Sequence, residues 1–156
     1  MITRRTSLGL LSAGLVLSVL PAHSTAAPLV QVFKDPSCGC CDAWVDHLAR
    51  AGFRTQITET AEVSAIKTRH ALPETLWSCH TALVEDYVIE GHVPAQALVR
   101  LLSERPSALG LAVPGMPVNS PGMEVSGAAS ENYTVILIGK DGRQRDFMQF
   151  RGTQPL

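Results

Sequence analysis

The chain has few aromatic residues, few charged residues and no apolar run long enough to cross a membrane easily. Aromatic residues make up 5% of its 156 residues, charged residues make up 17%, and the formal net charge is −1. Because the sequence contains no basic patch and little aromatic surface, we do not expect it to bind nucleic acid. The apolar run at 8–20 is shorter than the roughly 20 residues of a comfortable membrane span.

The first 26 residues have the pattern of a secretory signal. Arg4 and Arg5 precede the apolar run, and Ser24 and Ala26 stand at positions −3 and −1 of a cleavage site after Ala26. A charged start, a short apolar stretch and a small-residue exit are typical of a signal peptide that is removed. The alternative is an anchor helix that the mature protein retains.

Export has consequences for location, charge and domain organisation. The letters TRRTS also hint at the twin-arginine route, although Ser7 stands where a bulky apolar residue would strengthen that pattern. We therefore predict a periplasmic protein, exported by the Sec or the twin-arginine route, with no membrane contact after cleavage. Residues 27–156 would form one domain, and loss of Arg4 and Arg5 moves the formal charge to about −3.

Three of the four cysteines fall within four positions, in DPSCGCCDAW, and the fourth is Cys79. The periplasm is oxidising, so thiols there tend to pair, and four cysteines permit three pairings. A vicinal Cys40–Cys41 disulfide would be strained, and a Cys38–Cys40 disulfide would close a very small ring. A Cys38–Cys41 disulfide or a bridge to Cys79 is favoured.

The hydrophobic pattern predicts an α/β protein in which these cysteines lie where a strand turns into a helix. A buried strand at 28–35 is followed by Ser37, a good capping residue, and by an amphipathic helix that ends near Gly52. Further predicted elements are a strand at 53–59, a helix from Thr60 to Pro73, two strands within 80–93, a helix after Pro94, a Gly/Pro/Met loop at 107–131 and a hairpin of 133–139 with 143–152. The order predicts a thioredoxin-like mixed sheet flanked by helices, with an extra C-terminal β-hairpin.

Cys38 and Cys41 form a C-x-x-C pair at the start of a helix, where free N–H groups and the helix dipole stabilise a thiolate. Thiolates serve both disulfide exchange and metal binding. Cys40 adds a third thiol to the pair, which favours a soft-metal platform over a simple redox couple. The segment that should face this turn reads Cys79-His80-Thr81, without the proline usual there in thioredoxin-like proteins, so we expect Cys79 to meet the other three cysteines.

Four thiolates favour Cu(I), zinc or an iron–sulfur cluster. Zinc commonly uses two C-x-x-C pairs and this chain has one, while the cysteine spacing matches none of the usual iron–sulfur patterns. Cu(I) accepts two or three thiolates, and bridging thiolates can hold several ions. Met116 and Met123 offer soft thioethers in the 107–131 loop, where the alternative role is to pack that loop on the core. Two histidines are further candidate ligands, with packing or capping as the alternative: His80 and His92.

Three segments together resemble a known family: CGCC after the first strand, CHTALVEDYVIEGHVP, and GMPVNSPGME in the loop. The chain resembles the periplasmic CopG-like copper-resistance proteins, described as predicted metal-binding proteins. The resemblance implies a thioredoxin-like fold, a copper-linked role, and a site at Cys38, Cys40, Cys41, Cys79, Met116 and Met123. It leaves open whether the protein is a copper store, a copper chaperone or a copper oxidoreductase.

The residues and the resemblance lead to one favoured hypothesis and three alternatives. The favoured one is a periplasmic protein that holds copper, preferably Cu(I) and with several ions per chain, for copper resistance or homeostasis. Its partners would be copper ions and other periplasmic copper-handling proteins. The alternatives are a thioredoxin-type thiol–disulfide oxidoreductase that uses Cys38 and Cys41, an enzyme or carrier that cycles bound copper, and a metal-free fold stapled by two disulfides.

Overall fold

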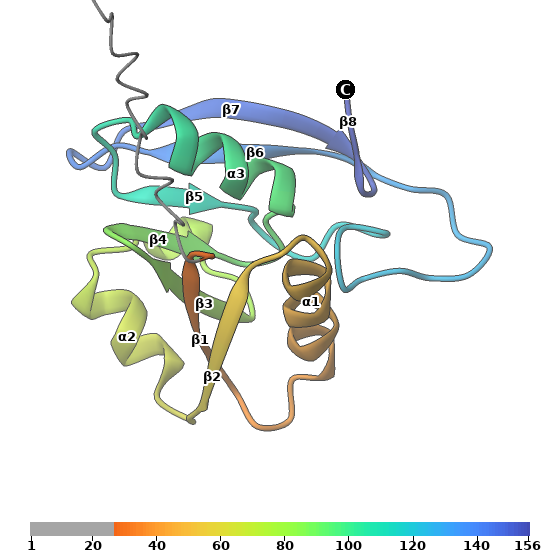
Figure 1. Cartoon of the computed structure of the whole chain (residues 1–156), viewed down its shortest axis with the longest axis horizontal. Coiled ribbons are helices and arrows are strands. Elements are labelled where there is room, and N and C mark those ends of the chain that lie inside the picture. Colours follow the sequence, from red (N-terminus) through yellow and green to blue (C-terminus); the bar gives the residue numbers. More distant parts are fainter. Residues whose placement is uncertain (1–26) are drawn as a thin grey trace, which may run out of the picture.

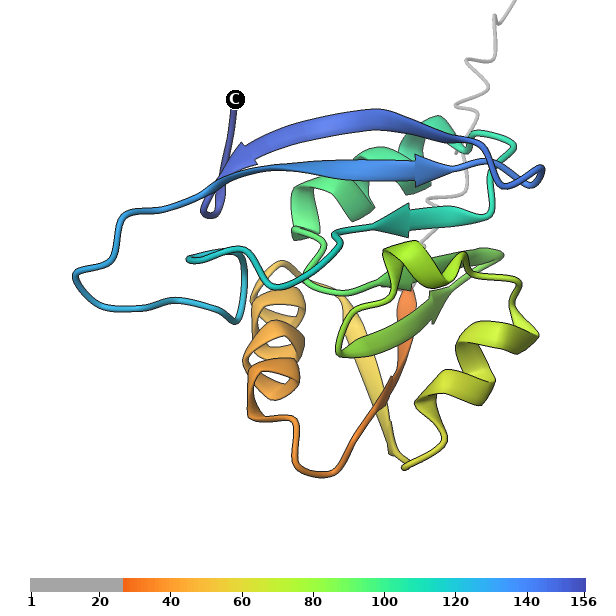
Figure 2. The ribbon, with the colours of Figure 1, turned by 180° about the vertical axis from the view of Figure 1, so that it is seen from behind.

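The computed structural model describes residues 27–156, so the predicted signal peptide at 1–26 lies outside the described residues. The described chain has an α/β fold, with one mixed β-sheet and helices on both of its faces (Figures 1 and 2). The strand order is β2-β1-β3-β4-β5-β6-β7-β8. The strands are β1 (Leu29–Lys34), β2 (Arg54–Glu59), β3 (His80–Val84), β4 (Tyr87–Glu90), β5 (Gly110–Ala112), β6 (Asn132–Ile138), β7 (Gln144–Arg151) and β8 (Gln154–Pro155). The helices are α1 (Gly39–Arg50), α2 (Val63–Arg69), α3 (Ala95–Glu104) and a short 3-10 turn, η1 (Glu74–Leu76).

Two helical crossovers organise the half of the sheet that carries the cysteines. Strands β1 and β2 pair in parallel and are joined through α1, and β4 and β5 pair in parallel and are joined through α3. Parallel neighbours need such a crossover, whereas β3 and β4 are antiparallel and need only a tight turn. Strand β3 also pairs antiparallel with β1, and this register sets Lys34 at the end of β1 opposite His80 at the start of β3.

The two faces of the sheet are covered by different helices. The main core lies between the sheet and the helices α1 and α3, and it contains fully buried side chains such as Trp44, Leu48 and Leu98. A second, smaller cluster lies on the other face, where Leu72 and Leu76 from the α2–η1 segment pack on Val88. Alternation along β3 divides its side chains between these clusters, which is the period-2 pattern of a strand buried on both sides.

The C-terminal part of the sheet contains two strands that the sequence did not predict, β5 and the two-residue β8, which pairs with β7. The predicted hairpin is present, because β6 and β7 pair antiparallel. The predicted 107–131 loop, however, contains β5, which pairs with both β4 and β6. This strand has only three residues and begins at Gly110, where a side chain would collide with the backbone of Val88. Glycine therefore allows the close approach of β5 to β4. Because glycine is unfavourable in strands, the sequence pattern did not predict this strand.

Two predicted helix caps, Ser37 and Thr60, are wrong by one and by two residues. The N-cap of α1 is Cys38 and not Ser37, whose backbone N–H and hydroxyl both bond to Asp35 Oδ1 before the helix begins. The N-cap of α2 is Glu62, and Thr60 instead accepts a hydrogen bond from the Glu62 N–H. In both cases a short polar side chain bonds to a nearby residue and forms a turn ahead of the helix.

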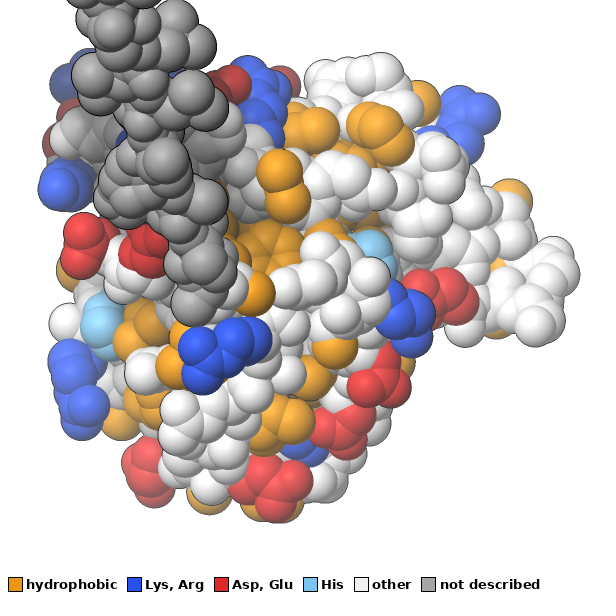
Figure 3. All heavy atoms as spheres, in the orientation of Figure 1, with side chains coloured by type: hydrophobic (Ala, Val, Ile, Leu, Met, Phe, Trp, Pro, Cys, Tyr) orange, Lys and Arg blue, Asp and Glu red, His pale blue; other side chains and the backbone are white. Residues whose placement is uncertain are grey.

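Within residues 27–156, no helix is long and apolar enough to cross a membrane. On the face shown in Figure 3, Lys and Arg side chains are scattered among acidic and apolar ones, in agreement with a sequence that has no basic patch.

Candidate metal centre

The first turn of α1 carries three of the four cysteines. Cys38 and Cys41 are joined by a disulfide, and the Cys40 sulfur lies 3.6 Å from the Cys38 sulfur. Cys41 is fully buried, while Cys38 and Cys40 are partly exposed. The structure therefore shows the oxidised form of one of the two pairings that the sequence favoured, and it leaves Cys40 and Cys79 as free thiols.

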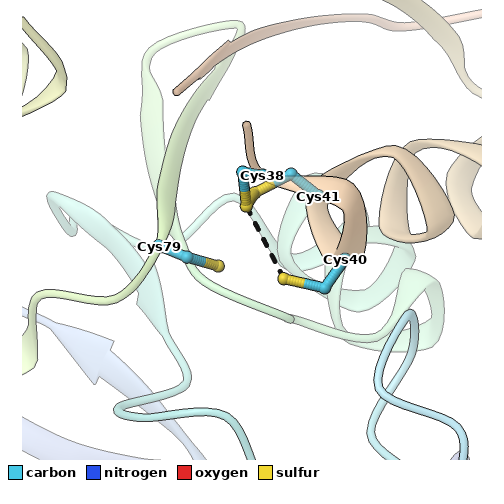
Figure 4. Close-up of side chains that lie close together, drawn as sticks. All are labelled: Cys38, Cys40, Cys41 and Cys79. Carbon is cyan, nitrogen blue, oxygen red and sulfur yellow. Dashed lines mark hydrogen bonds between the residues drawn. A yellow bond between two sulfur atoms is a disulfide. The ribbon is translucent and has the colours of Figure 1, made fainter. Parts of the chain in front are cut away.

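Cys79 lies opposite this turn, at the entry to β3 (Figure 4). The pairing of β1 with β3 carries the start of β3 to the end of β1, from which the chain runs into α1. As a result, the four cysteine sulfurs all lie within 4.8 Å of one another. The predicted meeting of Cys79 with the other three cysteines is confirmed.

His92 presents a lone pair toward the Cys79 sulfur. Its Nδ1 lies 2.7 Å from the carbonyl oxygen of Pro121. A carbonyl can only accept, so Nδ1 carries the proton and donates it. In the neutral ring Nε2 is then an acceptor, and this atom lies 3.1 Å from the Cys79 sulfur. Metal-binding histidines are commonly fixed in this way by a backbone carbonyl behind the ring.

His80 is buried beside the same sulfur, and its Nδ1 lies 3.3 Å from it. The ring packs on Trp44, with 4.3 Å between ring centroids. Burial is the main cause that holds the pKa of His80 well below 6.5, with further contributions from His92 and Lys67. Its Nε2 is buried and has no hydrogen-bond partner among the described residues. Together with Cys79 and His92, this histidine forms a second group of donor atoms within 4.8 Å of one another.

The Cys79 thiol holds its proton strongly in the absence of metal. Burial, reinforced by the neighbouring Cys40 thiol, raises its pKa from 9.0 to about 12. A neutral thiol at this position can donate to His92 Nε2 and accept from His80 Nδ1. A metal ion bound here would have to displace the thiol proton, because the thiolate is the form that ligates.

The loop that carries Met116 and Met123 contacts the cysteine region at two points. The Ser78 hydroxyl donates to the carbonyl of Gly115, directly before Met116. Gly122, directly before Met123, packs on the backbone of the first two turns of α1. The Met116 side chain is 51% exposed and Met123 is partly buried. Both methionines therefore follow residues that touch the segments bearing the cysteines.

Sequence reasoning missed a buried, hydrogen-bonded group of three side chains behind the site: Glu90, Lys67 and Thr81. Glu90 is fully buried and accepts hydrogen bonds from the Ser78 N–H, from Thr81 and from Lys67. An acidic residue at an inward position of a strand was a usable signal, because a buried carboxylate requires partners. The position of Lys67 gave no such signal, since lysine is common in helices.

The sequence predicts that His47, six residues after Cys41, is a surface residue, and the structure corrects this. Its ring is half-buried, and its Nε2 accepts a hydrogen bond from the Ala95 N–H, the first residue of α3. It therefore satisfies a free N–H group at the start of a second helix. Burial is the main cause that lowers the pKa of His47 below 6.5.

Comparisons with known proteins agree on one relationship. The family described as "Protein of unknown function, DUF411" matches residues 76–123. A solved structure named "Copper resistance protein copG- Form 2" is 37% identical, with a TM-score of 0.75, and the match covers 80% of this chain and 98% of that one. A structure named "Copper resistance protein copG- Form 1" is 38% identical, with a TM-score of 0.74 and the same coverage. A search among curated proteins found no match.

Proposed function

We propose, because the chain belongs to the copper resistance protein CopG family, that it binds copper as Cu(I) through the thiolates of Cys38, Cys40, Cys41 and Cys79. The observation that carries this proposal is the convergence of four sulfurs within 4.8 Å of one another. Sulfur donors are soft and favour monovalent copper over harder ions. Copper resistance or homeostasis is the role that such binding would serve.

The full set of four thiolates requires reduction of the disulfide. Two electrons and two protons from an external dithiol convert the Cys38–Cys41 bond into two thiols, while that dithiol becomes a disulfide. Each Cu(I) that binds a thiol then displaces its proton. Because one thiolate can bridge two ions and the four sulfurs are mutually close, we propose a cluster of more than one Cu(I) per chain.

His92 and His80 are the proposed nitrogen donors to the same centre. The Pro121 carbonyl holds His92 so that Nε2 faces the Cys79 sulfur, and Nδ1 of His80 lies 3.3 Å from the same sulfur. Both rings have lowered pKa values, with burial as the main cause, which keeps the rings neutral as metal ligation requires. Met116 and Met123 are proposed as outer donors that the loop delivers to the rim of the cluster.

Anaerobic titration of reduced residues 27–156 with Cu(I) tests the proposal. We expect binding of more than one ion per chain, with a sulfur-to-copper charge-transfer band in the near ultraviolet. Cys79→Ala should lower the number of ions bound, because it removes the sulfur that closes the set. Met148→Leu is the control, since it removes a sulfur that packs on the main core. Absent binding, or unchanged stoichiometry in Cys79→Ala, would refute the proposed centre.

We also propose that the fold is thioredoxin-like. The order β1-α1-β2 followed by β3-β4-α3, with β1 between β2 and β3 in the sheet, supports this classification. The position of the disulfide at the start of α1 supports it as well. Strands β5 to β8 would then be additions at one edge.

A second candidate function is thiol–disulfide exchange at Cys38 and Cys41. The observation in its favour is a disulfide at a helix N-terminus, the position where a thiolate leaving group is stabilised. In the reaction, a partner dithiol is oxidised as the Cys38–Cys41 disulfide is reduced, or the reverse. Against it stand the third thiol and the absence of proline at 79–81. Insulin reduction by metal-free protein, retained in Cys40→Ser and Cys79→Ser, would favour this candidate.

Location and copper handling complete the proposal. We propose that residues 1–26 direct export to the periplasm, which cell fractionation would test, and that other copper-handling proteins exchange ions with the site. Voltammetry of the copper-loaded protein would separate a store from a redox carrier. A reversible wave favours a carrier, and its absence across the accessible range favours a store.

A further inference from the structure

A buried ion pair lies next to the segment that carries Cys79. Glu90, at the end of β4, has a side chain that is 0% exposed, and Lys67 on α2 has one that is 5% exposed. The two side chains are in direct contact, and Lys67 Nζ also donates to the Thr81 hydroxyl at 2.8 Å. Neither residue of the pair is among the candidate metal ligands, which are cysteines, histidines and methionines, so the pair needs a separate explanation.

The carboxylate of Glu90 holds the chain on both sides of Cys79 and His80. One oxygen accepts the backbone N–H of Ser78 at 2.5 Å, and the other accepts the Thr81 hydroxyl at 2.6 Å. Ser78 and Thr81 directly bracket the two donor residues in the sequence. A single buried side chain therefore fixes both ends of the Cys79-His80 dipeptide.

The sheet itself does not supply the first of these bonds. Strand β3 begins at His80, so the Ser78 N–H lies outside the strand ladder and needs another acceptor. A buried ion pair is a weak source of stability, because two apolar side chains of similar size would fill the same space. What apolar side chains cannot do is accept the Ser78 N–H at a defined position.

We propose that Glu90, held in place by Lys67, is a positioning residue that fixes the Ser78–Cys79 backbone and so directs the Cys79 thiol to the first turn of α1. The inference rests on the proposed function only where it concerns copper. The placement of the thiol itself can be measured without metal.

Thiol alkylation in the oxidised, metal-free protein tests the placement. With the Cys38–Cys41 disulfide intact, a Cys40→Ser background leaves Cys79 as the one free thiol, and a Cys79→Ser background leaves Cys40. The variant K67M/E90M replaces the ion pair with apolar side chains of similar volume. Its matched control is R100M/E104M, which removes an exposed ion pair on α3.

We expect K67M/E90M to raise the alkylation rate of Cys79 about tenfold, by increasing the local opening of a half-buried thiol. The rate of Cys40 should stay within about twofold, and R100M/E104M should change neither rate. A Cys79 rate within about twofold of the parent overturns the inference, and so does equal acceleration of both thiols, which would show general loosening. If K67M/E90M does not fold, E90Q serves in its place. Its amide oxygen can accept only one of the two bonds, from Ser78 or from Thr81, so we expect a smaller rise of about threefold in the Cys79 rate, and a rate equal to that of the parent overturns the inference.

Copper binding supplies a second measurement on the reduced protein. Competition with a chromogenic Cu(I) chelator should show affinity weakened by about tenfold or more in K67M/E90M, a size typical of residues that orient ligands. If the parent protein binds no Cu(I), the proposed function fails while the alkylation result still decides the positioning role. If the parent binds Cu(I) and K67M/E90M binds it equally well with an unaltered charge-transfer spectrum, the positioning role alone fails.

Discussion

Replacing Gly122 with alanine tests whether the Pro121-Gly122-Met123 segment holds the loop against α1 and against His92. Gly122 has φ +86°, and a Cβ atom there would lie 2.7 Å from both the Cys40 carbonyl oxygen and the Trp44 nitrogen. Both atoms belong to the backbone of the first two turns of α1, which cannot move aside as a flexible side chain would. The loop must therefore lift, and the adjacent hydrogen bond from His92 to the Pro121 carbonyl lengthens or breaks.

The size of the effect follows from three contributions. The left-handed conformation costs a side chain roughly 1–2 kcal/mol. The collision with α1 adds about 1–3 kcal/mol, as overpacking does in cores. Loss of the His92 hydrogen bond adds about 1 kcal/mol. Gly127→Ala is the matched control, because Gly127 has φ +78° and open space around its Cβ position, so it carries the first contribution alone.

Chemical unfolding of residues 27–156 is the assay, with far-ultraviolet circular dichroism as the signal. Gly122→Ala should lose about 2–4 kcal/mol more free energy of unfolding than Gly127→Ala. Reduced Gly122→Ala should also bind Cu(I) about 10–100-fold more weakly, because the orienting partner of His92 is displaced. Equal losses of stability in the two variants would show that the close contact between the loop and α1 does not constrain the protein, and the reasoning would be wrong.

Three further predictions concern His47, Lys67 and copper itself. Burial lowers the pKa of His47 in the folded protein, so its neutral form contributes stability that is full above about pH 6.5 and is lost as the pH falls below that value. The free energy of unfolding, measured from pH 8 to 5 (roughly the window of this titration), should therefore fall in the parent and fall less in His47→Gln. Identical pH profiles of the two proteins would contradict this prediction. Lys67→Met should lower the free energy of unfolding by about 3–5 kcal/mol, because it leaves the Glu90 carboxylate buried without a counterion, whereas K67M/E90M should lower it clearly less. Equal losses in urea unfolding would contradict the role of Lys67 as the counterion of Glu90. Cu(I) at a free concentration 100 times its dissociation constant should stabilise the reduced protein by about 2.7 kcal/mol for one site. At the same free concentration, calorimetry should show a smaller gain in Cys40→Ser/Cys79→Ser, which keeps only the Cys38 and Cys41 thiols, and an equal gain would contradict the four-cysteine site.

The sequence was sufficient for the features that depend on local pattern. The apolar strand before DPSCGCC, the helix after it and the C-terminal hairpin all follow from hydrophobic period and turn residues, and the structure confirms them. The meeting of Cys79 with the α1 cysteines was predictable for another reason. A C-x-x-C turn and a facing segment occupy fixed places in the fold that the element order indicated, so the long-range contact followed from the topology.

The remaining features depend on contacts that no local pattern records. Strand β5 has three residues and exists because two neighbouring strands bond to it. The contact between Gly122 and α1 joins segments about 80 residues apart, and a glycine in a Gly/Pro-rich loop gives no sign that it packs on a helix. The pairing of Lys67 with Glu90 is equally non-local. A short helix and a strand edge each show one charged residue, and only the folded chain shows that they meet.

The candidate donor atoms come from three separate segments, and two of these segments are held by hydrogen bonds. The Cys79-His80 dipeptide is bracketed by the Glu90 carboxylate and His92 is fixed by a loop carbonyl, whereas the start of α1 is packed against Gly122. Hydrogen bonds fix direction as well as distance, whereas apolar packing tolerates repacking with small shifts. Substitutions at these contacts should therefore weaken copper binding more than their cost in stability suggests. A core truncation such as Leu98→Ala should do the opposite, with a loss of about 2–5 kcal/mol and a nearly unchanged site.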